Sequence, residues 1–383
     1  MLSKVLGRTA VVAACVGLSV TLTTGTAAAS TSQARGAVTW LAAQAHDDGG
    51  FGDAGLTADA IFAFVSADAG SQYTAAAVEF LSDRSVLDGY IGTAEAGFRA
   101  PQTAKILLAA QAAGADVTDF GGVNLEAALR GLEGTDGRFS GVLAQQLSVL
   151  VLARSDQGVS SAAVDALAGM QCDDGGYSWS TTGGACTGDV DFTAYALAGL
   201  LAAGEGVASE RALNWLESVQ GESGGFTAGF PGAPENSNST GLAAGALASG
   251  GRQAAADKAV AFVLSLQQGC DAPADEQGGI AYDASGFQPG NAIMATAQSV
   301  TGLTGEFLDT LDFSDDTAEL PGLDCGSETT PSEGEATDAA GGPVAQLPVT
   351  GSSLTIPVMA GVLALLVGAT LLVVSRRRVT ATG

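Results

Sequence analysis

The chain contains a single histidine, His46, and only 15 lysine and arginine residues against 41 aspartates and glutamates. Hydrolysis by a serine–histidine or cysteine–histidine pair would depend on that one imidazole, and a zinc site would lack a second histidine. Nucleic-acid binding requires a positively charged surface, which this composition does not supply. No glycine-rich phosphate loop with a lysine is present, and no acidic segment has EF-hand spacing. We therefore expect no nucleic-acid partner, no metal and no cofactor.

Both ends of the chain have the composition of targeting segments. Lys4 and Arg8 precede an uncharged apolar stretch, and small residues follow at Ala27, Ala28 and Ala29. This order is typical of a secretory signal peptide, so we predict a signal peptide over residues 1–29. Near the other end, residues 356–374 form an uncharged apolar run that is long enough to cross a bilayer as a helix. Three arginines at 376–378 follow this run and would stay on the cytoplasmic side.

A short motif stands just before the apolar run. Its residues are Leu347, Pro348, Val349, Thr350 and Gly351. With the apolar run and the arginines, it resembles the LPxTG sorting signal of Gram-positive surface proteins, in which a sortase cysteine attacks the Thr–Gly bond. The resemblance implies a sorting signal over residues 347–383, sortase as a partner, and a covalent link from Thr350 to peptidoglycan. An ordinary single-pass membrane anchor is the alternative. We expect a secreted protein that is held in the membrane before sorting and in the cell wall afterwards.

Removal of the predicted signal peptide and sorting tail would make the net charge more negative and leave four cysteines. The predicted mature chain keeps 10 basic and all 41 acidic side chains, a formal charge of −31. An even number of cysteines in a secreted chain indicates disulfides, and we favour Cys172 with Cys186 and Cys270 with Cys325 among the three possible pairings. A four-cysteine metal site is the alternative, but it lacks closely spaced CxxC pairs.

The body of the chain is repetitive. Segments that resemble one another begin at residues 37, 77, 126, 163, 212 and 259, and several end in glutamine. Each is followed by a turn rich in glycine, of the type Asp/Glu-Gly-Gly-aromatic, which includes residues 46–52, 88–92 and 172–179. After each turn comes a strongly apolar stretch. These stretches cover residues 57–67, 103–113, 141–153, 193–203, 240–248 and 291–303. The pattern predicts helical hairpins with a more exposed first helix and a buried second helix.

These glutamine–glycine–aromatic units resemble the repeats of squalene and terpenoid cyclases and of protein prenyltransferase β subunits. The resemblance spans about residues 36–306 and implies an all-α fold, an (α/α)6 toroid of six helical hairpins, within residues 30–312. An open solenoid is the alternative. Residues 313–346 are acidic and poor in apolar side chains, which predicts a disordered linker before the sorting signal.

Asp191 is the one weak catalytic candidate. It lies in Asp189-Val190-Asp191-Phe192-Thr193, which resembles the acidic segment of squalene–hopene type cyclases, whose middle aspartate protonates an olefin. Phe192 stands where that pattern has a further aspartate. Because Asp, Asn or Ser precedes several of the apolar stretches, we instead predict that Asp191 is a helix N-cap.

Other enzyme readings find little support. Prenyltransferase chemistry would need a zinc site and basic residues for a diphosphate, whereas Lys105 and Arg154 are isolated on the predicted inner helices. Glycosidases need only two carboxylates, but no pair stands out on these helices. Cobalamin carriers share the toroid but add a β domain that is missing here. We therefore favour a wall-anchored, non-catalytic binding or interaction module with a small hydrophobic ligand. The alternative is a secreted enzyme acting on a polysaccharide or isoprenoid.

Overall fold

The computed structural model describes residues 24–180, 186–230, 232–312, 319–323 and 325, and the fold of this part is almost entirely helical. Two short antiparallel hairpins interrupt the helices. They are β1 (Gly92–Thr93) with β2 (Gly97–Phe98), and β3 (Phe226–Thr227) with β4 (Glu235–Asn236). The all-α prediction is confirmed.

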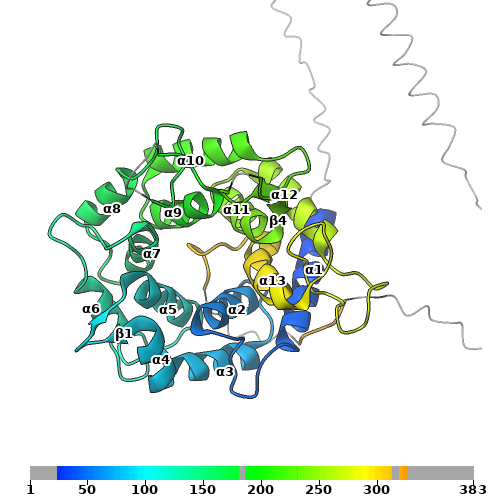
Figure 1. Cartoon of the computed structure of the whole chain (residues 1–383), viewed down its shortest axis with the longest axis horizontal. Coiled ribbons are helices and arrows are strands. Elements are labelled where there is room, and N and C mark those ends of the chain that lie inside the picture. The colour runs from blue at the N-terminus through cyan, green and yellow to red at the C-terminus, as the bar shows by residue number, and fades with distance from the viewer. Residues whose placement is uncertain (1–23, 181–185, 231, 313–318, 324, 326–383) are drawn as a thin grey trace, which may run out of the picture. The chain divides into compact units, whose positions relative to one another are not determined.

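One set of helices forms a closed inner ring (Figure 1). Its members are α2 (Ala54–Ser66), α5 (Ala100–Ala112), α7 (Val142–Ala153), α9 (Val190–Ala202), α11 (Ser237–Ser249) and α13 (Pro289–Thr304). Each packs against the next along the chain, and α13 packs against α2, which closes the ring. These are the predicted apolar stretches, and they are buried on nearly every face, as an all-round hydrophobic helix must be. The fold is the predicted α/α toroid.

A second set of helices lies outside this ring. Its members are α1 (Thr24–Ala42), α3 (Ser71–Ser82), α6 (Leu125–Arg130), α8 (Ser161–Ala168), α10 (Gly206–Val219) and α12 (Gln253–Leu266). They bury one face only: in α10, Leu213 and Leu216 are buried whereas Val207 is exposed. One predicted turn is wrong, because residues 88–91 belong to a further helix, α4 (Arg84–Ile91). Asp83 caps this helix by accepting from Ser85 N and Val86 N, and the turn comes only at Gly92, whose φ is 89°.

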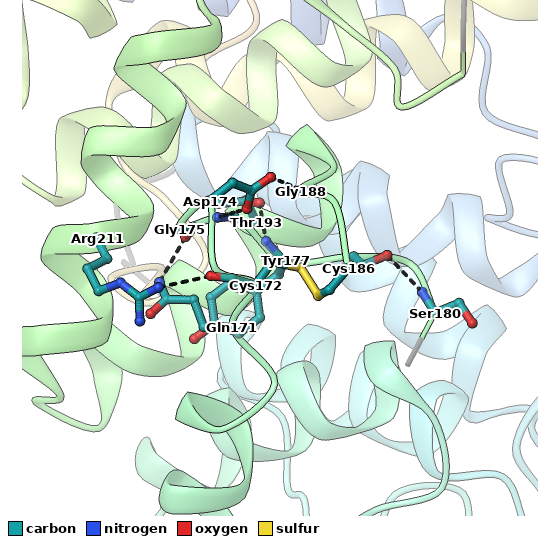
Figure 2. Close-up of a disulfide and its surroundings, with 12 residues drawn as sticks. Gln171, Cys172, Asp174, Gly175, Tyr177, Ser180, Cys186, Gly188, Thr193 and Arg211 are labelled. Carbon is teal, nitrogen blue, oxygen red and sulfur yellow. Dashed lines mark hydrogen bonds between the residues drawn. A yellow bond between two sulfur atoms is a disulfide. The ribbon is translucent and has the colours of Figure 1, made fainter. Parts of the chain in front are cut away.

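The repeated glutamine and glycine tie each hairpin to the next one. Gln171 Nε2 donates to the carbonyl of Gly175 in its own turn and to that of Ala208 in α10, both at 2.8 Å (Figure 2). A Cβ on Gly176 would lie 2.8 Å from the Trp215 ring, so only glycine lets the next outer helix approach. Gln220 bridges to Ala255 O and Gln267 bridges to Gln33 O in the same way. The repeat motif is thus explained by packing between neighbouring units.

A threonine near the start of four inner helices, α2, α9, α11 and α13, anchors the end of the preceding turn. Its Oγ1 accepts from a backbone N–H at 2.8–3.0 Å. The pairs are Phe51 to Thr57, Tyr177 to Thr193, Phe226 to Thr240 and Ile280 to Thr296. In α7 the side chain of Gln145 takes this role for Phe139 N. The threonine beside Asp191 therefore has a structural function that recurs around the ring.

One disulfide joins Cys172 to Cys186 (Figure 2), and a second joins Cys270 to Cys325, which is consistent with the predicted pairing. Within the described residues no group of three or more His, Cys, Asp and Glu side chains is arranged to hold a metal ion.

Most of the predicted targeting segments lie outside the described residues, including the sorting motif at 347–351 and the apolar run at 356–374. Helix α1 begins at Thr24, so cleavage after Ala29 would leave residues 30–42 of it. From the predicted linker, Leu320 packs on the core, and Pro321 O accepts from Thr39 Oγ1 at 3.0 Å. No helix in the described part is long and apolar enough to span a membrane.

Candidate binding cavity

Side chains from all six inner helices line one central cavity. The anchoring threonine sets which side chain of each helix reaches it. Two residues after that threonine, after Thr103 in α5 or after Gln145 in α7, every inner helix contributes a lining residue. These residues are Asp59, Lys105, Leu147, Tyr195, Leu242 and Gln298. The register of the repeat, and not any single motif, therefore builds the cavity wall.

One side of the cavity is apolar. Leu143 and Leu147 from α7 and Leu242 from α11 line it, together with Leu308. Leu308 belongs to the segment that follows α13 and crosses the inside of the ring in Figure 1.

The segment that carries Leu308 is held at the C-terminal ends of the inner helices. Arg154, at the end of α7, donates from Nη1 to Asp309 O at 2.6 Å. Ser249, at the end of α11, donates to Asp309 Oδ2 at 2.6 Å. Arg154, which the sequence places apart from other basic residues, therefore bonds to this segment. It fixes the segment that limits the cavity at this end.

The other side of the cavity is polar. Lys105 Nζ lies 2.8 Å from Asp59 Oδ1, and Gln298 Nε2 donates to Asp59 Oδ2 at 3.1 Å. Asn238 Nδ2 in turn donates to Gln298 Oε1 at 2.9 Å. Sequence reasoning did not identify a partner for Lys105, which the neighbouring helices α2 and α5 bring to Asp59. Sequence reasoning also missed Asp59 and Gln298, which an alignment of the inner helices on their threonines would have found.

The pKa values of Lys105 and Tyr195 are both raised by their surroundings in the cavity wall. Burial lowers the pKa of Lys105, but the charge and the hydrogen bond of Asp59 outweigh this effect, so the net pKa is raised. Desolvation raises the pKa of Tyr195 well above its usual value, and the negative charge of Asp59 adds to the effect. Both groups therefore keep their protons at neutral pH, and the cavity presents an ammonium ion and a phenol.

Asp191 lies one turn before Tyr195 on α9, and its predicted role as an N-cap is wrong. The cap is Asp189, whose Oδ1 accepts from Phe192 N at 3.1 Å, because helix α9 begins two residues earlier than a cap at Asp191 requires. Asp191 receives a hydrogen bond from Ser239, but its Oδ1 is buried without a partner among the described residues. Desolvation, opposed by Ser239 and reinforced by the charge of Asp189, raises its pKa to about 6.

No protein-family model and no curated protein matches this sequence. Solved structures do resemble it. A type II terpene cyclase, MstE from Scytonema, in complex with the substrate geranylgeranyl dihydroxybenzoate, has 16% identity and a TM-score of 0.53 over 75% of this chain and 99% of its own. The same enzyme with the product merosterolic acid A has 16% identity and a TM-score of 0.51 over 73% of this chain and 97% of its own. A glycosidase has 11% identity and a TM-score of 0.48, over 74% and 97%. The cyclase matches show the α/α toroid fold.

Proposed function

We propose that this protein is a binding module of the cell surface, whose toroid takes a small, mainly apolar ligand into its central cavity. The observation that carries the proposal is the composition of the wall, where leucines on one side face a few fixed polar groups on the other. Concave sites of this kind, apolar with a small number of placed polar groups, are the usual form of small-molecule sites.

The same wall is poorly suited to the rival reaction, the cyclisation of an isoprenoid through a carbocation. Lys105 and Asp59 form an ion pair in the wall, so this polar group supplies no net negative charge that would stabilise a cationic intermediate. Only Phe62 and Tyr195 among the lining residues carry the aromatic faces that attract cations. The charge distribution therefore favours binding over this chemistry.

Filling the cavity tests the binding proposal. Ala297 is buried in the cavity wall, and we expect Ala297→Phe to block the labelling of Leu143, Leu147 and Leu242 by a diazirine-bearing dodecane. The full chain in lipid nanodiscs is irradiated with the probe, and the labelled peptides are identified by mass spectrometry. Ala297→Ser keeps the space open and serves as the matched control. Absence of label on these residues in the unchanged protein would exclude a ligand cavity.

The second part of the proposal is anchoring to peptidoglycan through Thr350, which is supported by the motif at 347–351 and the segments around it. Replacing Thr350 by alanine is expected to move the protein from the fraction released by wall-digesting enzymes to the fraction extracted by detergent. Val349→Ala changes the variable position of the motif and should leave the distribution as it is. Complete extraction of the unchanged protein by detergent alone would refute the sortase link and favour a simple membrane anchor.

A second candidate function, acid catalysis by Asp191, rests on its buried and unpartnered Oδ1 and on a pKa raised to about 6. A buried acid of this kind can donate a proton near neutral pH. It would correspond to the alternative of a secreted enzyme acting on an isoprenoid or a polysaccharide.

The substitution Asp191→Asn separates a catalytic carboxyl from an inert one. Because the folded-state pKa of Asp191 is raised from 3.8 to about 6, the stability of the native protein falls as pH rises through that interval. The neutral amide escapes this penalty, so the variant should gain about 1–3 kcal/mol at pH 7 and nothing at pH 3. We expect no product from squalene or from a glycan in either protein. Turnover by the unchanged protein that is lost in Asp191→Asn would make Asp191 a catalytic acid.

A further inference from the structure

The polar side of the cavity contains a hydroxyl that the protein itself does not use. Thr301 lines the cavity on α13, one turn after Gln298, and only 2% of its surface is exposed. Its Oγ1 has no hydrogen-bond partner among the described residues. A buried hydroxyl without a partner costs free energy, and such an atom in a cavity wall indicates a missing partner in the ligand.

Lys105 offers further donors on the same side of the ring. An ammonium group carries three N–H donors, and the contact with Asp59 at 2.8 Å accounts for one of them. The Lys105 side chain is 20% exposed, compared with 8% for Asp59, so the lysine is the more accessible member of the pair.

The acceptors of the lining residues Asp59 and Gln298 are already engaged, whereas Asn238 Oδ1, which does not line the cavity, has no partner among the described residues. Asp59 Oδ1 faces Lys105, and Asp59 Oδ2 accepts from Gln298. The amide oxygen of Gln298 accepts from Asn238. The cavity therefore presents mainly unused donors, from Lys105 and Thr301, opposite a wall of leucines.

We infer that the ligand is a neutral, mainly apolar molecule that presents an oxygen acceptor, such as a ketone, ester, ether or alcohol, to Thr301 and Lys105. This inference rests on the proposed binding function and names the class of ligand. A pure hydrocarbon would leave both donors unpaired, which costs affinity. A carboxylate would have to give up its water shell beside Asp59, whose negative charge already neutralises Lys105.

A competition experiment tests this class directly. The full chain in lipid nanodiscs is labelled with the diazirine-bearing dodecane, and dodecan-2-one, dodecane and dodecanoate are compared as competitors. We expect dodecan-2-one to compete at about tenfold lower concentration than the other two, the ratio that one hydrogen bond to a charged or unpaired donor supplies.

Thr301 gives a clean pair of variants, because its hydroxyl makes no bond within the described part of the protein. In Thr301→Val the preference for the ketone over dodecane should fall at least threefold, while the competition by dodecane itself is unchanged or improved. Thr301→Ser keeps the hydroxyl and should keep the preference. If the ketone competes no better than dodecane, or if the valine variant retains the preference, the inference is wrong and the binding proposal survives. If the probe fails to label the cavity at all, the binding proposal itself is wrong.

Discussion

Replacing Trp40 by alanine is expected to lower the free energy of unfolding by about 3–5 kcal/mol, the range measured for large aromatic side chains removed from a core. Trp40 is 5% exposed and packs where the last turn of the ring meets the first helix. A Cβ on Gly279 would lie 2.8 Å from its ring, and its Nε1 donates to Asp275 O at 2.8 Å. The substitution thus removes both packing and a hydrogen bond at the seam between α1 and the last turn, which is one of the contacts that close the ring.

The position of Trp40 makes a second outcome measurable. We expect hydrogen exchange to accelerate first in α1 and α13, because these helices meet at the seam. Trp215→Ala removes the equivalent contact between two units that follow each other in the sequence. This variant should accelerate exchange around α10 instead. Trp179 is 67% exposed, so Trp179→Ala should change stability by less than about 0.5 kcal/mol. A Trp40 variant as stable as the Trp179 variant would show that the seam does not hold the ring closed.

The fold could be predicted from the sequence because its determinants are local and repeated. Each inner helix is recognisable by an apolar composition on all sides, and each turn by glycines that the next outer helix requires. The glutamine that precedes these turns bonds to the next repeat unit, as Gln171 does to Ala208 O. Its recurrence along the sequence therefore indicates the length of the repeat. Helix α4 escaped this reasoning, because Asp83 starts a new helix where the other units place a turn.

The cavity could not be predicted in the same way, because its polar groups meet only when the ring closes. Asp59 and Gln298 come from opposite ends of the chain, yet they are 3.1 Å apart between α2 and α13. Counting charges along the sequence therefore could not show that Lys105 has Asp59 as its partner. The Asp191 error has a different cause: two aspartates stand at the start of α9, and the exact first residue of the helix decides which of them caps it.

Replacing Lys105 by methionine is expected to destabilise the protein by about 3–5 kcal/mol at neutral pH, because it leaves the buried carboxylate of Asp59 without its counter-charge. Methionine keeps the apolar stem of the side chain, so the loss reports on the charge more than on packing. The Asp59 side chain is 8% exposed and water cannot take over the role of the ammonium.

The pH dependence follows from the raised pKa of Lys105, which lies above the ordinary value of 10.5. A lysine whose folded-state pKa is raised contributes its full stability below the unfolded value and loses it as pH rises through the folded value. The deficit of Lys105→Met should therefore be constant between pH 6 and 9 and shrink only in alkaline solution.

The double variant Asp59→Asn with Lys105→Met separates an unpaired charge from a packing defect. Asparagine at position 59 carries no charge but can still accept from Gln298, so the double variant should recover at least half of the stability lost in the single one. Urea unfolding of the three full-length proteins, followed by the exchange rates of α2 and α5, measures the difference. A double variant as unstable as Lys105→Met would mean that the lysine stem fills space in the wall and that the ion pair adds little. In that case the ammonium would be retained for what it offers to a ligand and not for the stability of the ring.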